Sequence, residues 1–228
     1  MKSIDKAVFL HKSSFSSSSL LVTYYTEKNG LQKFIFKGGK KRAHHLFPMA
    51  FSEIEYYGRN NDLLNITNTE SVFPQSFQFN PVKSTIAFFI GEVIRKSVEP
   101  GDRDSQLFSF LEKQTKRLEE EEKIHLYPIQ FLVEFTNSLG IYPLIEEGGE
   151  KVFNIDSGRF QHTASIHQKT YVGESVNLII SFLNKEEPPS TNKKVREESL
   201  KILLNYYSTH IPSFNKLESY EILKEVLG

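Results

Sequence analysis

The chain has 228 residues, of which 39% are hydrophobic, and its 28 Lys and Arg balance its 28 Asp and Glu. This is enough apolar material for two small domains, and it excludes wholesale disorder. Cysteine is absent, which excludes a disulfide framework, a thiolate zinc site and a thiol nucleophile.

The charges are distributed unevenly along the chain. Residues 1–80 hold ten Lys or Arg and six Asp or Glu, whereas residues 81–228 hold eighteen and twenty-two. This asymmetry suggests two regions with different partners. Met1–Leu10 contains no long apolar run, and no stretch approaches the ~20 apolar residues that a membrane-spanning helix needs. We therefore expect a cytoplasmic protein with no signal peptide and no membrane partner.

The first seventy residues are predicted to be β-structure. Their apolar segments are short, rich in β-branched and aromatic residues, and separated by turn-forming residues. Asn29-Gly30 favours a hairpin turn, whereas His11–Ser19 and Gly38–Arg42 are expected to be loops, the second of them flexible and basic. The expected strands are Ala7–Leu10, Leu20–Thr26, Leu31–Lys37, Phe51–Tyr57 and Leu63–Thr69, with a turn at Gly58–Asp62. Five such strands predict a small barrel or an open sheet.

From Pro81 onward the apolar residues recur at helical spacing. Asp104 is expected at a helix start, where a carboxylate is favourable, and Gly140 is expected as a C-cap. The expected helical segments are residues 86–94, 107–118, 129–139, 176–183, 195–207 and 217–227. An irregular insert at about 141–173 contains a predicted hairpin at residues 151–160. The predicted fold is therefore α+β, with a β-domain over residues 1–79 and an α-helical domain over residues 80–228.

The basic run of residues 28–42 is the main functional signal, because it contains six cations and no acid. Cations hold phosphates and aromatic faces stack on unpaired bases, so a β-surface that carries both is typical of single-strand binding. Strand alternation places Phe34 and Phe36 on one face, where core positions are expected. Lys33 and Lys37 lie on the other face and are expected to contact phosphate. The alternative is a solvated hairpin whose charged edge resists sheet-to-sheet association, and composition favours neither.

No catalytic signature is present. The sequence lacks a P-loop, a G-x-G-x-x-G fingerprint and a G-x-S-x-G elbow. Its histidines show no metal-ligand spacing, and the acidic run Glu119–Glu122 predicts a solvated helix face. We therefore expect a non-enzymatic binding protein that uses no metal or other cofactor.

The order of these features resembles the RecO family of bacterial recombination mediators. In the β-region, the resemblance rests on the hairpin Asn29-Gly30-Leu31, the basic loop Lys37–Arg42 and a Pro-x-x-Phe-x-x-Ile-Glu pattern at Pro48–Glu55. In the helical region, the matching segments are Ile90–Ile94, Leu107–Leu111, Leu139–Pro143 and Leu217–Leu223. The resemblance runs nearly from end to end.

The resemblance implies an oligonucleotide-binding (OB) barrel followed by an α-helical domain. It implies a nucleoid-associated DNA-repair mediator that binds single- and double-stranded DNA and anneals complementary strands. It also implies cooperation with RecR in loading RecA onto DNA coated with single-strand binding protein (SSB), and contact with the acidic, Phe-ending SSB tail. The expected DNA-binding residues are Lys33, Lys37, Lys40, Lys41, Arg42, His44 and Arg59. The expected rim of a groove for the SSB tail is Arg95, Lys113, Lys116 and Arg117.

One departure from the family concerns metal. Many members carry four cysteines after the element that corresponds to Gly140–Pro143, and these cysteines form a zinc site. This chain has none, so zinc is expected to be absent and apolar packing to hold the insert. A competing hypothesis remains: a protein-interaction scaffold whose barrel does not bind DNA and whose basic loop only keeps it soluble.

Overall fold

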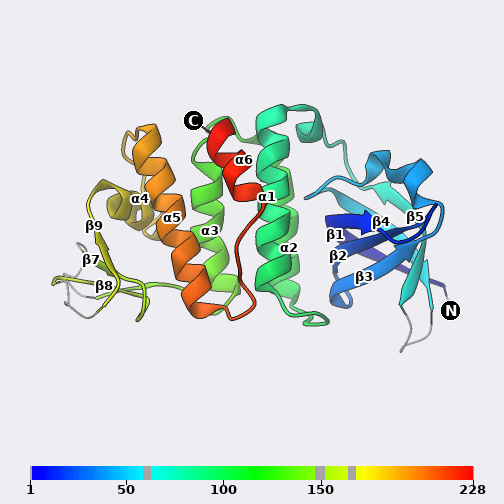
Figure 1. Cartoon of the computed structure of the whole chain (residues 1–228), viewed down its shortest axis with the longest axis horizontal. Helices are drawn as coiled ribbons and strands as arrows, with labels where there is room; N and C mark the ends of the chain where they lie inside the picture. The colour runs from blue at the N-terminus through cyan, green and yellow to red at the C-terminus, as the bar shows by residue number, and fades with distance from the viewer. Residues whose placement is uncertain (1, 59–62, 147–151, 164–167, 228) are drawn as a thin grey trace. The chain divides into compact units, whose positions relative to one another are not determined.

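The computed structural model describes residues 2–58, 63–146, 152–163 and 168–227, without the side chains of residues 43–45. An N-terminal sheet is followed by helices (Figure 1), which confirms the α+β class. The chain forms two compact units, Met1–Glu122 with Leu217–Leu223, and Lys123–Lys216 with Lys224–Gly228. The first unit therefore contains two long helices as well as the sheet, and a domain boundary after residue 79 stays a prediction.

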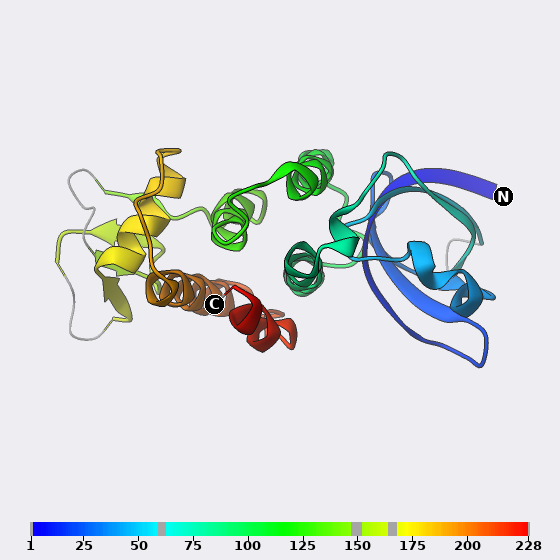
Figure 2. The same cartoon turned by 90° about the horizontal axis from the view of Figure 1, so that it is seen from above.

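The strands of the first unit close into a barrel in the order β1-β2-β3-β5-β4. Neighbouring strands are antiparallel except β3 and β5, which are parallel. Figure 2 shows these strands winding around a common interior. The strands are β1 (Lys2–Ser14), β2 (Leu20–Thr26), β3 (Gly30–Phe36), β4 (Phe51–Tyr57) and β5 (Leu64–Ser71). A small five-stranded barrel of this kind is the architecture expected of an OB fold.

Aromatic side chains fill the barrel, because alternate residues of a strand point to opposite faces of the sheet. Phe34 and Phe36 are 0% and 1% exposed, which confirms that they belong to the core. The ring of Phe34 lies edge-to-face with Tyr24 and Tyr56, at centroid distances of 6.0 Å and 5.2 Å. Lys33, one residue earlier on β3, is exposed on the outer face. The two phenylalanines are therefore not available as stacking platforms for bases.

Two segments of the barrel differ from expectation. The strand expected at Ala7–Leu10 runs from Lys2 to Ser14, because β4 and then β2 pair with its polar ends. Gly38–Arg42, expected to be a flexible loop, instead contributes to a 3₁₀-helix, η1 (Gly39–His45). Backbone hydrogen bonds rather than buried side chains order both segments, so hydrophobic periodicity does not reveal them.

All six expected helices are present in the described part of the chain. The side chain of Asp104 accepts hydrogen bonds from the backbone N–H groups of Gln106 and Leu107 at 2.7 Å and 3.1 Å, which confirms it as a helix cap. The helices are α1 (Pro81–Ser97), α2 (Ser105–Glu120), α3 (Tyr127–Ser138), α4 (Glu174–Leu183), α5 (Lys193–His210) and α6 (Ser219–Val226), and a short 3₁₀-helix, η2 (Phe77–Phe79), precedes them. No helix among the described residues is long and apolar enough to span a bilayer.

Glu92 on α1 holds the start of α6 within the first unit. Its carboxylate accepts hydrogen bonds from the N–H of Glu218 at 3.1 Å and from the N–H and hydroxyl of Ser219 at 2.9 Å and 2.6 Å. Burial raises the pKa of Glu92, but these hydrogen bonds and one from Lys96 together outweigh it and bring that pKa to about 2. The carboxylate is therefore ionised near neutral pH, as this role requires.

The insert is more regular than expected. Its predicted hairpin is confirmed, because β7 (Val152–Asn154) pairs antiparallel with β8 (Arg159–Gln161). The description as irregular is wrong, since β6 (Leu144–Ile145) and β9 (Thr170–Val172) complete a small sheet in the order β6-β8-β7-β9. Strands of two or three residues are too short to show a period in the sequence.

Candidate nucleic-acid interface

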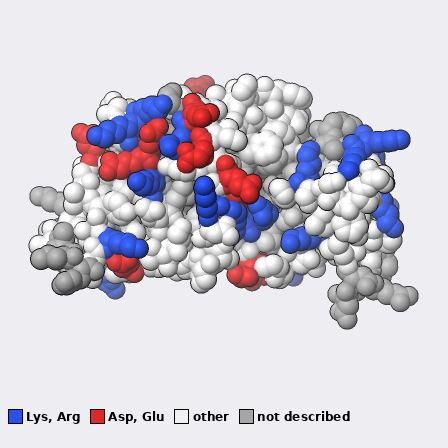
Figure 3. Space-filling view, in the orientation of Figure 1, with Lys and Arg blue, Asp and Glu red and all other residues white. Residues whose placement is uncertain are grey.

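Four of the predicted DNA-binding lysines lie on β3 and in the segment that follows it. Lys33 is on the outer face of β3, and Lys37 directly follows the strand. Lys40 and Lys41 lie in η1, and all four side chains are exposed. On the face drawn in Figure 3, Lys and Arg side chains stand out from the barrel. The sequence places these four lysines within nine positions, and the fold leaves all of them exposed.

The ammonium groups of these four lysines are open to a ligand. Among the described residues, none accepts a hydrogen bond from them or forms an ion pair with them. Lys28, at the start of the basic run, differs, because its ammonium group donates to the carbonyl of Ile4 at 2.6 Å. An anion that reaches this surface therefore meets four cations without first displacing a partner within the described chain.

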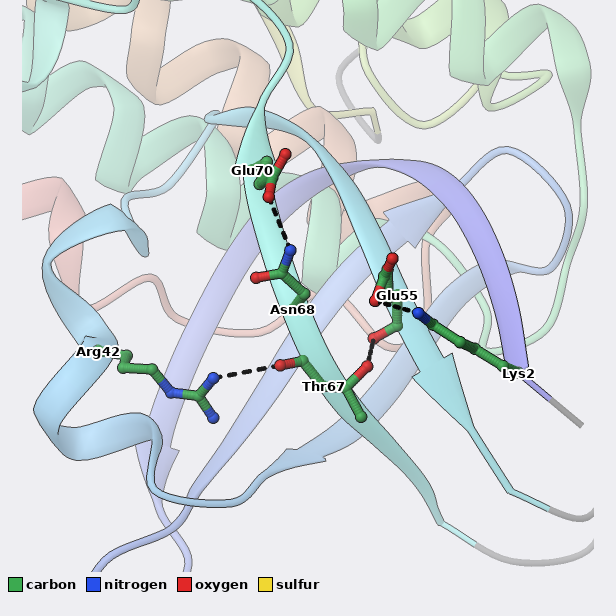
Figure 4. Close-up of polar contacts among 6 residues, drawn as sticks. All are labelled: Lys2, Arg42, Glu55, Thr67, Asn68 and Glu70. Atoms are coloured by element: carbon green, nitrogen blue, oxygen red, sulfur yellow. Dashed lines mark hydrogen bonds and ion pairs between the residues drawn. The ribbon is translucent and has the colours of Figure 1, made fainter.

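Arg42 has a different environment from the four lysines, and Figure 4 shows its hydrogen bond to Thr67. Its Nη2 donates to the carbonyl of Lys37 at 2.8 Å, and its Nη1 donates to the carbonyl of Thr67 at 3.2 Å. The guanidinium carbon also lies 4.5 Å from the centre of the Phe36 ring. The side chain is exposed, yet it links η1 to the end of β3 and to β5.

Two of the predicted ligands have no described side chain. His44 falls within η1, but its side chain is outside the described part of the structure. Arg59 lies wholly outside the described residues. Both remain predictions.

Further contacts hold η1 against the barrel. The N–H of Lys40 donates to the carbonyl of Ser18 at 3.3 Å. Directly after η1, the carbonyl of Leu46 accepts a hydrogen bond from the ammonium group of Lys12 on β1 at 2.9 Å. Sequence reasoning missed the roles of Lys12 as a donor and of Thr67 as an acceptor. A hydrogen bond between a cation and a backbone carbonyl far along the chain leaves no local pattern in the sequence.

The β4–β5 side of the barrel is different in charge. Lys2 forms an ion pair with Glu55 at 2.8 Å, and Asn68 donates to the carboxylate of Glu70 at 2.8 Å (Figure 4). The hydroxyl of Thr67 donates to the carbonyl of Glu55 at 3.1 Å. Carboxylates repel phosphate, so this side is less favourable for a polyanion than β3 and η1.

The four cations predicted to bind the SSB tail lie on two helices. Lys113 is exposed on α2, while Lys116 pairs with Glu112 at 2.8 Å and Arg117 pairs with Glu121 at 3.2 Å. The ammonium group of Lys116 also lies 5.8 Å from the centre of the Phe73 ring.

Arg95 is on α1, and its Nε is buried without a hydrogen-bond partner among the described residues. Burial and then the charge of Arg95 lower the pKa of His11. A groove rimmed by Arg95 together with the three α2 cations stays a prediction.

The described residues of the insert do not offer the donors of a zinc site. The chain has no cysteine, and no group of three or more His, Asp or Glu suited to a metal occurs among the described residues. Nε2 of His210 is instead 2.7 Å from the carbonyl of Ile155. Phe153 stacks on Phe160 with ring centroids 4.3 Å apart, and it contacts Tyr206 at 5.3 Å. The described residues of the insert therefore fit an aromatic core and not a metal, and the absence of zinc stays a prediction.

We expect metal analysis of the purified protein to find no stoichiometric zinc, and a chelator to leave the unfolding temperature unchanged. The reason is that domains held by zinc lose folding free energy when the metal is withdrawn, whereas a ring stack does not respond to a chelator. Zinc at one equivalent, or a lower unfolding temperature with chelator, would contradict the expectation.

Comparison with known proteins yields matches over nearly the whole chain. The family model "Recombination protein O N terminal" matches residues 1–74, and "Recombination protein O C terminal" matches residues 78–219. The DNA repair protein RecO of Flavobacterium psychrophilum and that of Flavobacterium johnsoniae are each 28% identical to this chain over 98% of both sequences. The DNA repair protein RecO of Phocaeicola vulgatus is 26% identical over 97% of both.

Proposed function

The chain belongs to the recombination protein O (RecO) family, and from this premise we propose that it acts in DNA repair and recombination by binding DNA on β3 and η1. The observation that carries the proposal is a set of four exposed ammonium groups, on β3 and in the segment that follows it, that bond to no described residue. Phosphates are held by such cations, and the release of condensed counterions supplies the free energy of binding.

The buried position of Phe34 and Phe36 determines which kind of DNA recognition the barrel supports. With those two rings unavailable for stacking, we propose that phosphate contacts, which carry no sequence information, supply most of the affinity. We therefore expect binding to single- and double-stranded DNA with little base preference. Cations that neutralise two strands at once lower the repulsion between them, which supports annealing without any bond chemistry, enzymatic activity or cofactor.

Family membership also supports a proposal about which proteins this chain works with. We propose that the protein works at the nucleoid in the cytoplasm with RecR to load RecA onto SSB-coated strands. For the acidic, Phe-ending SSB tail, the helical region offers Lys116 beside the ring of Phe73. A cation next to a partly exposed aromatic ring suits a ligand that combines a carboxylate with a phenyl group.

The competing function is a protein-interaction scaffold whose barrel never contacts DNA. The two functions differ in a simple measurement, because a cationic DNA surface retains measurable affinity at about 0.1 M salt. A labelled single-stranded oligonucleotide whose fluorescence anisotropy does not rise at that salt concentration indicates the scaffold.

We expect the double variant Lys40→Ala/Lys41→Ala to bind single-stranded DNA about 25-fold more weakly than the parent at about 0.1 M salt. On a single strand each phosphate contact contributes about 0.7 to the slope of log affinity against log salt, or about fivefold at this concentration. Four contacts predict a slope of about −3, and the double variant a slope of about −1.4. Anisotropy titrations over a series of salt concentrations measure both quantities.

The matched control is Lys193→Ala/Lys201→Ala, which removes the same charge from α5 in the second compact unit. We expect its affinity and salt slope to equal those of the parent. Circular dichroism checks that every variant is folded. If the two double variants bind equally well, β3 and η1 are not the DNA surface.

A further inference from the structure

Arg42 is the one predicted DNA ligand among the described side chains whose cationic group already bonds within the protein. Its two terminal nitrogens donate to the carbonyls of Lys37 and Thr67. We propose that Arg42 is a positioning residue, which holds η1 so that Lys40 and Lys41 meet the DNA, and that it is not itself a phosphate ligand. This inference rests on the proposed DNA-binding function and assigns one residue a different part in it.

The two carbonyls belong to neighbouring strands of the barrel. Lys37 follows β3 and Thr67 lies on β5, and these strands pair in parallel with Phe36 opposite Ile66. A guanidinium presents its N–H donors in a rigid planar fork, so one side chain bonds to both carbonyls at once. The 4.5 Å distance to the centre of the Phe36 ring adds a cation–π contact, which fixes the plane of the fork.

The η1 segment needs such a clamp. It spans seven residues, with three adjacent cations and no acid in its first turn, whereas 3₁₀-helices longer than three or four residues are uncommon. Its i→i+3 pattern begins with a hydrogen bond of 3.3 Å between the N–H of Lys41 and the carbonyl of Gly38. Repulsion among Lys40, Lys41 and Arg42 opposes this turn, so bonds to the barrel must offset it.

The decisive variant is Arg42→Lys, because it keeps the charge and removes the fork. An ammonium group is a compact point charge and does not bridge the two carbonyls in a planar geometry. We expect single-stranded DNA affinity at about 0.1 M salt to fall at least about fivefold, the contribution of one phosphate contact. If Arg42 binds phosphate directly, the lysine binds it as well. Affinity within about twofold of the parent therefore overturns the proposal.

A second measurement tests whether Arg42 acts through the two lysines. In the Lys40→Ala/Lys41→Ala background, we expect Arg42→Lys to change affinity by less than about twofold, because the groups that it positions are gone. An equal loss in both backgrounds shows an independent role and overturns the proposal. A side chain that only stabilises the fold also fails this test, since titrations well below the unfolding temperature do not respond to stability.

A third measurement uses no DNA. Hydrogen exchange at the amides of residues 39–45 is expected to be faster in Arg42→Lys than in the parent, and exchange in β1 and β2 is expected to be unchanged. If hydrogen exchange in η1 is the same in Arg42→Lys and in the parent, the proposal that Arg42 holds η1 is overturned. If the parent itself fails to bind DNA, the proposed function fails, while this exchange experiment still decides whether Arg42 holds η1.

Discussion

Replacement of Phe153 by alanine is expected to lower the unfolding free energy of the second compact unit by about 3–5 kcal/mol. Phe153 is 0% exposed, and its ring lies almost parallel to that of Phe160, with an interplanar angle of 8°. The other side of the stack is Tyr206 of α5, whose hydroxyl donates to the carbonyl of Ile141 at 2.6 Å. Removal of the ring leaves a cavity between the small sheet and the helix. Hydrogen exchange at the amides of β7 and β8 measures the loss.

Phe79→Ala is a control for the loss of a phenyl ring elsewhere in the chain, because Phe79 is 81% exposed and lies in the first compact unit. We expect it to change stability by less than about 0.5 kcal/mol. DNA affinity is expected to be unchanged in Phe153→Ala, since the barrel belongs to the other compact unit. Equal effects of the two substitutions on the second unit would show that something other than the ring stack, such as a bound metal, holds the insert.

Gly30→Ala is expected to destabilise the first compact unit by about 3–4 kcal/mol. The backbone of Gly30 has φ of +64°, which costs a residue with a Cβ about 1–2 kcal/mol. A Cβ here also clashes with the carbonyl oxygen of Asp102, and backbone does not move aside cheaply. Displacement of that loop breaks hydrogen bonds from the N–H of Gly101 to the carbonyl of Leu31 and from the N–H of Asp104 to the hydroxyl of Tyr25. Urea unfolding measures the change.

Gly140→Ala separates the cost of the positive φ from the cost of the clash with Asp102. Gly140 has a similar φ of +69°, and a Cβ at this position meets nothing within 4 Å. We therefore expect Gly140→Ala to cost only the backbone term of about 1–2 kcal/mol. The difference between the losses of unfolding free energy in Gly30→Ala and Gly140→Ala then measures the cost of the clash with Asp102. Equal losses would mean that the loop adjusts freely around the hairpin.

Much of the fold follows from local sequence. Phe34 and Phe36 alternate with outward residues, which is enough to predict a strand with both rings in the core. The helices have long apolar periods, so all six are recognisable. The strands β6 and β9 and the helix η1 are not, because a few residues carry no period and their order comes from hydrogen bonds to distant segments.

The candidate site, like the fold, was predictable from the sequence only in part. The sequence by itself determined that six cations fall in residues 28–42, and that Lys33 lies opposite to the core face of its strand. It did not distinguish among those cations, since they have the same charge and similar neighbours.

Only the tertiary structure decided which cations are engaged. It bonds Lys28 to the carbonyl of Ile4 and Arg42 to that of Thr67, twenty-five residues further on, and it leaves Lys33, Lys37, Lys40 and Lys41 open among the described residues. The physical reason is that the acceptor carbonyls lie on other strands. Barrel closure, which brings β3 beside β5, therefore places Arg42 against the backbone of β5.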